Sequence, residues 1–286
     1  MRAFFVSDMH GRVARYRRLF ESVRDERPDA VLLGGDLLPM GLIAGDEQVD
    51  GGFIEDFLGG ELSRLRDDLG SGYPVFIVIL GNDDPRHYET AALELETAGL
   101  WRYAHGRRIE CDAMTVYGYS HVPPTPFLLK DWERYDVSRF VDPGAVSPEE
   151  GHRSVPVEAH RVRNATIKDD LQKLAGGDDL SRAVFLFHSP PHRTRLDRAA
   201  LDGQMVDHVP VDVHVGSVAI RRFIEERQPL ITLHGHVHES AELTGSWRDR
   251  IGRTHLFGAA HDGPELALVQ FDPDDPETAT RQLLRV

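Results

Sequence analysis

The most distinctive stretch of the chain is residues 233–240, which read Leu-His-Gly-His-Val-His-Glu-Ser. It follows the apolar residues 229–233, which predict a buried strand. Three histidines at the end of such a strand are costly to place for packing alone. In extended backbone His236 and His238 would share one face, which suits coordination of one metal ion or of two adjacent ions. A histidine-rich surface turn is the alternative that this stretch leaves open.

Five short apolar runs recur along the chain, and each is followed by residues able to bind a metal ion. Near-continuous runs of Val, Ile, Leu and Phe indicate strands covered on both faces. The runs are residues 2–7, 30–33, 75–80, 183–187 and 229–233. The polar residues that follow them are Asp8, His10, Asp36, Asn82, His188, His236 and His238.

Helical patterns separate these runs, and strands that alternate with helices predict an α/β layered fold. In such folds ligands bind beyond the carboxyl ends of the strands. The polar residues that follow the five apolar runs all lie at such ends. Gly70 is a plausible helix stop and Ser217 a good N-cap. The helical patterns cover residues 13–23, 53–69, 88–98, 162–174 and 218–227. Residues 241–245, 254–257, 265–271 and 278–286 predict an antiparallel β portion that closes the domain.

The length of 286 residues is compatible with a single domain spanning residues 1–286. Residues from about 120 to 160 are rich in Pro, Asp, Glu and Arg and show weak periodicity. We interpret them as a long ordered excursion near the site, because so little apolar content could not fold alone. In this excursion His121 and Trp132 would either line the pocket, pack within the loop or form a subunit contact.

Composition narrows the class of protein. The formal net charge of −14 argues against an extended nucleic acid as partner, because gripping its backbone requires basic patches. One cysteine excludes an internal disulfide framework and fits a cytoplasmic location. No apolar run approaches the roughly 20 residues of a membrane helix, so no membrane is expected as a partner. Fifteen histidines are the unusual feature and prompt a search for metal sites.

The seven polar residues at the strand ends form a mixed set of imidazole, carboxylate and amide ligands without a thiolate. Such a set suits Mn, Fe or Zn rather than Mg or Ca alone. Seven ligands are too many for one ion and too few for two closed shells. Two ions that share a carboxylate therefore fit. Taken singly, each residue also has an ordinary structural explanation, as a helix cap, a turn former or a loop histidine.

The order of the motifs resembles the calcineurin-like metallophosphoesterase family. The motifs are Asp-x-His at residue 8, Gly-Asp at 35, Gly-Asn-x-Asp at 81, a lone histidine at 188 and Gly-His-x-His at 235. The resemblance runs from residue 6 to about 240. Residues 122–127, the stretch His-Ser-Pro-Pro at 188–191 and Gly-Ser at 216–217 further resemble the Icc-related branch of that family.

The resemblance implies a four-layer αββα sandwich, in which two mixed sheets pack face to face between flanking helices. It also implies that Asp8, His10 and His238 hold one metal ion, that Asn82, His188 and His236 hold the other, and that Asp36 bridges them. Two divalent ions, two carboxylates and a bridging hydroxide would leave a net charge of about +1 in the pocket, which would attract an anionic phosphoester.

The chain departs from the family at Asp83, where the usual motif carries a histidine that protonates the leaving oxygen or stabilises the transition state. A carboxylate beside two cations has a lowered pKa and is a poor general acid. We therefore expect that His87 or His192 protonates the leaving group, or that substrates with good leaving groups are favoured. Arg12 would either contact the substrate phosphate or be a solvated arginine at a helix start. His234 is expected to support the ligands.

The predicted function is that of a metal-dependent phosphoesterase. Two divalent or transition metal ions would generate a bridging hydroxide that attacks phosphorus in a small substrate, with phosphodiesters favoured over monoesters. The alternative is a metal-binding regulatory or scaffold protein on the same fold, with little activity because of Asp83. A homo-oligomer is compatible with either.

Overall fold

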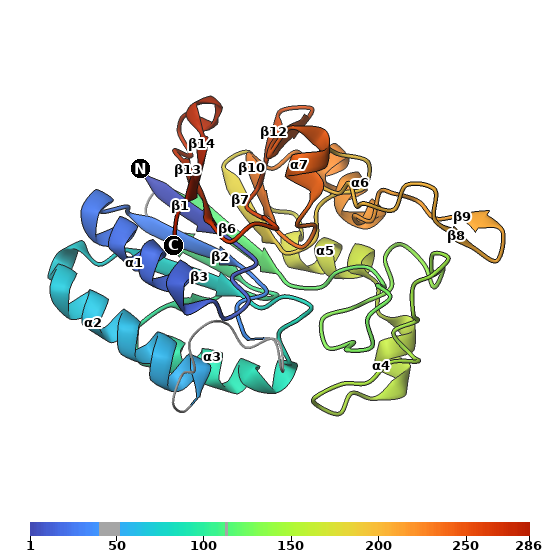
Figure 1. The fold of residues 1–286 in the computed structure, drawn as a ribbon, viewed down its shortest axis with the longest axis horizontal. Coiled ribbons are helices and arrows are strands. Elements are labelled where there is room, and N and C mark those ends of the chain that lie inside the picture. Colours follow the sequence, from blue (N-terminus) through green and yellow to red (C-terminus); the bar gives the residue numbers. More distant parts are fainter. Residues whose placement is uncertain (40–51, 112–113) are drawn as a thin grey trace.

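The structure is a computed structural model that describes residues 1–39, 52–111 and 114–286. These residues contain two six-stranded sheets that pack face to face, with helices on their outer faces (Figure 1). The first sheet has the strand order β14 (Thr280–Leu284), β13 (Leu266–Phe271), β1 (Ala3–Val6), β2 (Ala30–Gly34), β3 (Val75–Ile79) and β4 (Arg102–Tyr103). The second has the order β11 (Arg248–Ile251), β12 (Thr254–Gly258), β10 (Ile231–His234), β7 (Ala183–Phe187), β6 (Met114–Tyr119) and β5 (Arg108–Cys111). The predicted four-layer αββα arrangement is confirmed.

Helices cover both outer faces. Against the first sheet lie α1 (Val13–Glu26), α2 (Gly59–Leu69) and α3 (Glu89–Thr97), with a π-helical turn over Phe53–Leu58 that leads into α2. The second sheet is covered by α5 (Ile167–Ala175) and α6 (Val218–Arg227). The remaining described elements are two short helices, α4 (Ala159–Asn164) and α7 (Ser240–Thr244), and a small hairpin of β8 (Met205–Val206) and β9 (Val209–Pro210). Three single-turn 3₁₀ helices lie at Gly70–Gly72, Arg86–Tyr88 and Pro276–Thr278. The hairpin projects from the body of the molecule (Figure 1).

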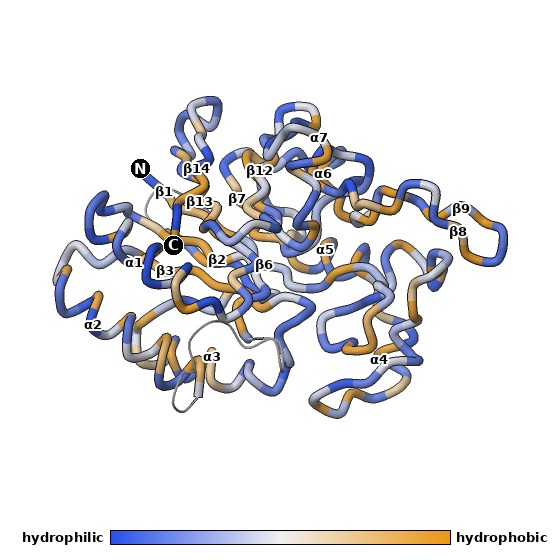
Figure 2. The backbone as a smooth tube through the Cα atoms, viewed as in Figure 1, coloured by the Kyte–Doolittle hydropathy of each residue, from blue (hydrophilic) through white to orange (hydrophobic). Residues whose placement is uncertain are grey.

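Alternating side chains of the buried strands separate the layers. In β1, Phe4 packs under the helices of the first sheet, whereas Phe5 lies between the two sheets. In β7, Leu186 lies between the sheets and Phe185 packs under α5 and α6. Successive side chains of a strand point to opposite faces, so strands that are apolar throughout supply both cores. Figure 2 shows this concentration of apolar residues in the sheet strands.

The direction of the central strands sets the position of the site. The strands β1, β2 and β3 run parallel to one another, and β7 runs parallel to β6 and β10. The carboxyl ends of parallel strands meet at one edge of a sheet, so the residues after β1, β2, β3, β7 and β10 gather there. The strands predicted from the five apolar runs and the helix boundaries at Gly70 and Ser217 agree with the structure.

Three expectations about the remaining elements were wrong. The single helix predicted over residues 162–174 is two helices, because Thr166 has extended backbone and caps α5 by accepting a hydrogen bond from the Asp169 N–H. Residues 241–245 are not a strand but belong to helix α7 and its left-handed cap at Gly245, as their Ala, Glu and Leu favour. The C-terminal strands do not form one antiparallel unit: β12 pairs parallel with β10, whereas β13 pairs with β1 in the other sheet.

The excursion between β6 and α4 packs against the strand ends. Trp132 is fully buried, and its indole N–H donates a 2.8 Å hydrogen bond to the carbonyl of Asp84. The backbone N–H of Arg86 donates to Asp131 at 2.8 Å. Within the excursion, the ammonium group of Lys130 lies 2.5 Å from Glu133, and both side chains are buried. Trp132 and His121 are therefore buried against each other and against His105, where they join the excursion to the rest of the chain. Among the described residues, no helix combines the length and apolar character required to cross a membrane.

Candidate metal centre

The structure brings all seven predicted ligand residues together beyond the strand ends. Four of them have one potential ligand atom each within 4.8 Å of one another: Asp8, His10, Asp36 and His238. A second group under the same distance limit contains Asp36, His188 and His236. Asp36 therefore belongs to both groups, as a residue shared by two ions would.

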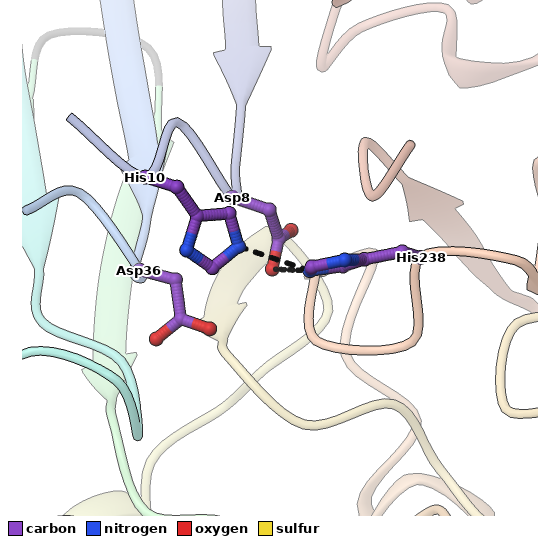
Figure 3. Close-up of side chains that lie close together, drawn as sticks. All are labelled: Asp8, His10, Asp36 and His238. Atoms are coloured by element: carbon purple, nitrogen blue, oxygen red, sulfur yellow. Dashed lines mark hydrogen bonds and ion pairs between the residues drawn. The ribbon is translucent and has the colours of Figure 1, made fainter. Parts of the chain in front are cut away.

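The first group is drawn from three separate segments (Figure 3). The Nε2 atoms of His10 and His238 are 3.1 Å apart, and His238 Nε2 lies 3.3 Å from Asp8 Oδ1. Two imidazole nitrogens and a carboxylate oxygen thus converge on one point, with the Asp36 carboxylate beside them. This donor set is typical of a transition-metal site.

The second group is buried more deeply. His188 Nε2 lies 3.1 Å from Asp36 Oδ2 and 3.0 Å from Asn82 Oδ1. Its other ring nitrogen, Nδ1, lies 2.8 Å from the Gly34 carbonyl. Donation of Nδ1–H to a backbone carbonyl orients an imidazole and leaves Nε2 for a metal. Asn82 therefore adjoins the second group, with its amide oxygen beside the same ring nitrogen of His188.

Strained backbone shapes the ligand loops. Asp8, His10, Asp36 and His236 all have φ between 47° and 73°, the left-handed region that non-glycine residues rarely adopt. Such conformations persist at functional sites where the surroundings hold them in place. Glycine is required beside them: a Cβ on Gly35, which has φ of +94°, would lie 2.7 Å from His188 Nδ1.

The expectation that His236 and His238 share a face of an extended strand was wrong. Strand β10 ends at His234, and the left-handed conformation of His236 starts a turn. The His236 N–H donates a 3.0 Å hydrogen bond to Asp8 Oδ1, and Val237 turns back into the interior. As a result, His236 lies in the second group and His238 in the first.

Protonated histidines balance the carboxylates of the site. Burial opposes the charged form of His188, but the Asp36 carboxylate raises the pKa of His188 to about 10. Burial likewise opposes the charge on His238, yet its hydrogen bond with Asp8 raises its pKa to about 9. By contrast, burial lowers the pKa of His236 to about 4. In the metal-free site, His188 and His238 thus carry positive charge beside Asp36 and Asp8. Bound metal ions would supply that positive charge instead.

Two orphaned atoms test whether a cation fits. Asp8 Oδ2 and His10 Nδ1 are buried and have no hydrogen-bond partner among the described residues. Leaving a buried acceptor unsatisfied costs free energy, and such atoms in native structures require an explanation. A metal ion would satisfy the lone pair of Asp8 Oδ2, whereas His10 Nδ1 is not the ring nitrogen that converges with His238. The orphaned Asp8 oxygen and the mixed N and O donors therefore fit a bound cation.

Asp83 lies at this site, in line with its position after Asn82. Its N–H donates a 2.8 Å hydrogen bond to Asp36 Oδ1, and its carboxylate accepts one from Asn82 Nδ2 at 2.8 Å. Asp83 Oδ2 is 3.9 Å from His10 Nδ1. Burial first, and then the Asp36 carboxylate, raise the pKa of Asp83 to about 8; bound cations would act in the opposite direction.

The structure does not bring the other predicted site residues into these groups. His87 is exposed; its ring packs on Tyr88 and its N–H donates to Ser154. His192, in the loop after β7, lies 3.8 Å from Asp212 and 3.9 Å from Asp197. Arg12 is exposed at the start of α1. Their proposed roles toward the substrate stay predictions.

His234 has a structural place. Its Nδ1 lies 3.0 Å from the Ser189 carbonyl and its Nε2 lies 2.8 Å from the Thr232 hydroxyl. With both ring nitrogens engaged and its ring stacked on Phe187, this histidine supports the loop and leaves no free ligand atom.

Two residues that hold the ligand loops were missed by the sequence interpretation. Asp84 is fully buried and accepts hydrogen bonds from the backbone N–H groups of Leu37, Leu38 and Gly81. Arg15 is also buried and donates a 2.7 Å hydrogen bond to the Asp8 carbonyl. The Gly-Asn-x-Asp motif pointed to Asp84, but nothing in the sequence distinguishes Arg15 from the solvated arginines around it.

The two-sheet fold and the paired donor groups define a class, that of α/β proteins suited to a dinuclear metal centre. The sequence matches the model of the calcineurin-like phosphoesterases over residues 1–240. The chain belongs to this family, as the order of its motifs predicted. It is therefore a hydrolase of phosphoesters, in a family that is dimetal-dependent. The narrower resemblance to the Icc-related branch stays a prediction.

Solved structures are similar across the whole chain. TT1561 of Thermus thermophilus is 15% identical, with 99% of both chains covered and a TM-score of 0.58. A dimetal phosphatase from Danio rerio, LOC 393393, is 12% identical, with 94% of this chain and 91% of that chain covered and a TM-score of 0.50. At these identities the likeness shows the fold alone. No curated protein matches the sequence.

Proposed function

We propose that this protein is a dinuclear-metal phosphohydrolase that prefers small phosphodiesters to phosphomonoesters. The observation that carries the proposal is the sharing of Asp36 between two groups of ligand atoms. Asp8, His10 and His238 would hold one ion with Asp36, and Asn82, His188 and His236 would hold the other. A scaffold protein has little use for two such groups, so the enzyme is favoured over the alternative.

When bound, two divalent ions would acidify a shared water toward neutral pH and neutralise charge on the phosphoryl oxygens. The chain's own residues prepare the site for them. The Gly34 carbonyl holds the His188 ring, and the His236 N–H holds the Asp8 carboxylate. Ligands held in place before binding lose less entropy when a cation binds.

The preference for diesters rests on Asp83, which adds a third carboxylate to Asp8 and Asp36. With bound cations lowering its pKa, Asp83 is ionised, and the pocket charge of about +1 estimated without it becomes about zero. A phosphomonoester carries up to two negative charges and a diester one. An extra like charge a few ångströms away costs ~1–4 kcal/mol, depending on the local dielectric. The monoester dianion is therefore penalised more than the diester.

We further propose that Mn, Fe or Zn occupies the site, since imidazole and carboxylate donors without a thiolate suit these ions. A cytoplasmic location fits a chain whose single cysteine forms no internal disulfide. The substrate is expected to be small, because a net charge of −14 offers no broad basic surface for a nucleic acid.

Hydrolysis of bis- and mono-(p-nitrophenyl) phosphate by metal-free protein reconstituted with Mn²⁺ tests this function. We expect turnover of both substrates, with the higher kcat/KM for the diester. Asp36→Asn, which alters the shared ligand, is the control and should lose turnover of both. Absence of turnover with Mn²⁺, Fe²⁺ and Zn²⁺ alike would favour the scaffold alternative, and a higher kcat/KM for the monoester would overturn the diester preference.

A further inference from the structure

Arg15 is a buried cation behind the first ligand group. It lies on α1, and only 4% of the residue is exposed. Its guanidinium donates to three backbone carbonyls: that of Asp8 at 2.7 Å, that of Gly263, and that of Pro264 at 3.4 Å. Burying a charge costs several kcal/mol unless its hydrogen bonds are well satisfied. An arginine on this helix face therefore calls for a role beyond packing.

Asp8 is held by hydrogen bonds both at its backbone and at its side chain. Its carbonyl accepts the Arg15 hydrogen bond. Its backbone is left-handed, with φ of 56°, and its N–H donates to the Gly35 carbonyl at 3.0 Å. Its Oδ1 accepts from the His236 N–H, whereas Oδ2 is buried without a partner among the described residues. Arg15 fixes the peptide plane that follows Asp8. It thereby opposes relaxation of this strained residue to a conformation in which Oδ2 would point elsewhere.

Arg15 also contacts the crossing segment, residues 259–265, which runs from β12 in the second sheet to β13 in the first. A second arginine holds the same segment: Arg281 on β14 donates a 2.7 Å hydrogen bond to the Ala260 carbonyl. Arg281 is partly buried, and its described hydrogen bond is with the segment and not with Asp8. The chain therefore contains a matched control that separates loss of the segment contact from loss of the Asp8 contact.

We propose that Arg15 is a positioning residue for the metal centre, which aims the Asp8 carboxylate at the first ion through the Asp8 carbonyl. The inference rests on the proposed role of Asp8 as a ligand. Its predicted effect on metal affinity is opposite to the effect expected from electrostatic repulsion alone. A positive charge near a bound cation weakens binding, so removal of a merely charged Arg15 would tighten it. Removal of a positioning residue loosens it, as loss of residues that orient metal ligands does.

The test is a titration of metal-free protein with Mn²⁺ alone, in which binding is measured by calorimetry and by electron paramagnetic resonance. Neighbouring Mn²⁺ ions give a spin-coupled signal, whereas a single ion gives an isolated six-line spectrum. Arg15→Met removes the positive charge and the planar set of guanidinium N–H donors. Arg15→Lys keeps the charge but not the planar set of donors. We expect about 10- to 100-fold weaker affinity for one of the two ions in both variants, with conversion to the isolated spectrum at limiting Mn²⁺. Asp8→Asn should weaken the same ion, and Arg281→Met should retain both.

Several outcomes would overturn the inference. One is that Arg15→Met binds both Mn²⁺ ions with wild-type or tighter affinity. Another is that Arg15→Lys recovers full affinity. A third is that Arg281→Met loses as much Mn²⁺ affinity as Arg15→Met does. Equal loss of both ions together with a lower Tm of the metal-free Arg15 variants would also do so, because Arg15 would then serve the fold as a whole. If instead Asp8→Asn still bound two ions with wild-type affinity, the ligand assignment in the proposed function would fail.

Discussion

His188 Nε2 lies 3.1 Å from Asp36 Oδ2, although the two residues follow strands of different sheets. The contact joins the ends of β7 and β2, and both side chains are buried. A buried imidazole and carboxylate at this distance form an ion pair that holds a proton when no cation is bound. Asp36 belongs to both ligand groups and His188 to the second, so the protonation state of the pair is linked to metal binding.

Metal binding should release protons. Without a metal the pKa of His188 is about 10 and that of His238 about 9, so both are protonated at pH 7 and must lose a proton to bind a cation. Uptake of two Mn²⁺ ions at pH 7 should release about two protons from these histidines, and about one more from Asp83, whose pKa of about 8 the bound cations would lower. Apparent affinity should then rise about tenfold per pH unit at each site until the pH approaches these pKa values. Calorimetry in buffers of different ionisation enthalpy measures the release, and affinity independent of pH between 6 and 8 would contradict the prediction.

The two histidines of the Gly-His-x-His motif should serve different ions, because His236 lies in the second group and His238 in the first. His236→Ala and His238→Ala should each lose one ion and retain the other, as metal analysis of protein purified without an affinity tag would show. His208→Ala, which removes an exposed histidine of the β8–β9 hairpin, is the matched control. Loss of the same ion from both variants would mean that the assignment is wrong.

Neutralising Asp83 should shift substrate preference. Asp83→Asn removes a carboxylate that contacts Asn82 and faces His10, so the penalty against a dianionic substrate falls. We expect kcat/KM for mono-(p-nitrophenyl) phosphate to rise about tenfold relative to that for the diester. Both substrates are assayed with the same reconstituted protein at one pH. An unchanged ratio would remove Asp83 as a determinant of specificity.

Reaction rates should depend steeply on the leaving group. Asp83 beside two cations is a poor acid, and His87 and His192 contact other parts of the chain. Departure of an unprotonated alkoxide is then difficult, so a series of aryl phosphodiesters should react more slowly as the pKa of the leaving phenol rises. A flat dependence would indicate an efficient general acid and argue against this interpretation of the site. Repeating the series with His192→Ala examines that histidine directly.

Asp84 should contribute strongly to stability. Its carboxylate accepts hydrogen bonds of 2.8–3.1 Å from the N–H groups of Leu37, Leu38 and Gly81. Asp84→Ala leaves these buried donors unpaired and should lower the free energy of unfolding by about 3 kcal/mol. Urea denaturation of the metal-free protein measures the change. Asp84→Asn keeps the side-chain volume and one acceptor oxygen and should cost less; equal costs for the two variants would contradict the prediction that unpaired N–H groups account for the loss.

The sequence alone determined much of this protein. The five apolar runs predicted the central strands, and the polar residues after them supplied all seven candidate ligands. Both inferences succeed for the same physical reason: a strand buried on both faces must be apolar throughout, and the residue that follows it is the first that is free to be polar. Elements with mixed composition were harder. Strand β5 alternates exposed and buried residues over four positions, and β11 carries charges, so neither stands out from loop sequence.

The family resemblance implied how the seven candidate ligands divide, but only the tertiary structure shows how the backbone brings that division about. Extended backbone would have placed His236 and His238 on one face, but the left-handed turn at His236 directs them to different groups. Sequence spacing does not reveal such a turn, because the hydrogen bond to Asp8 that holds it comes from the other end of the chain. For the same reason Arg15 escaped notice: its partners, Asp8 and the crossing segment, meet only when the two sheets have packed. Local pattern indicates which residues are candidate metal ligands, and the packing of distant loops determines which group of donors each one joins.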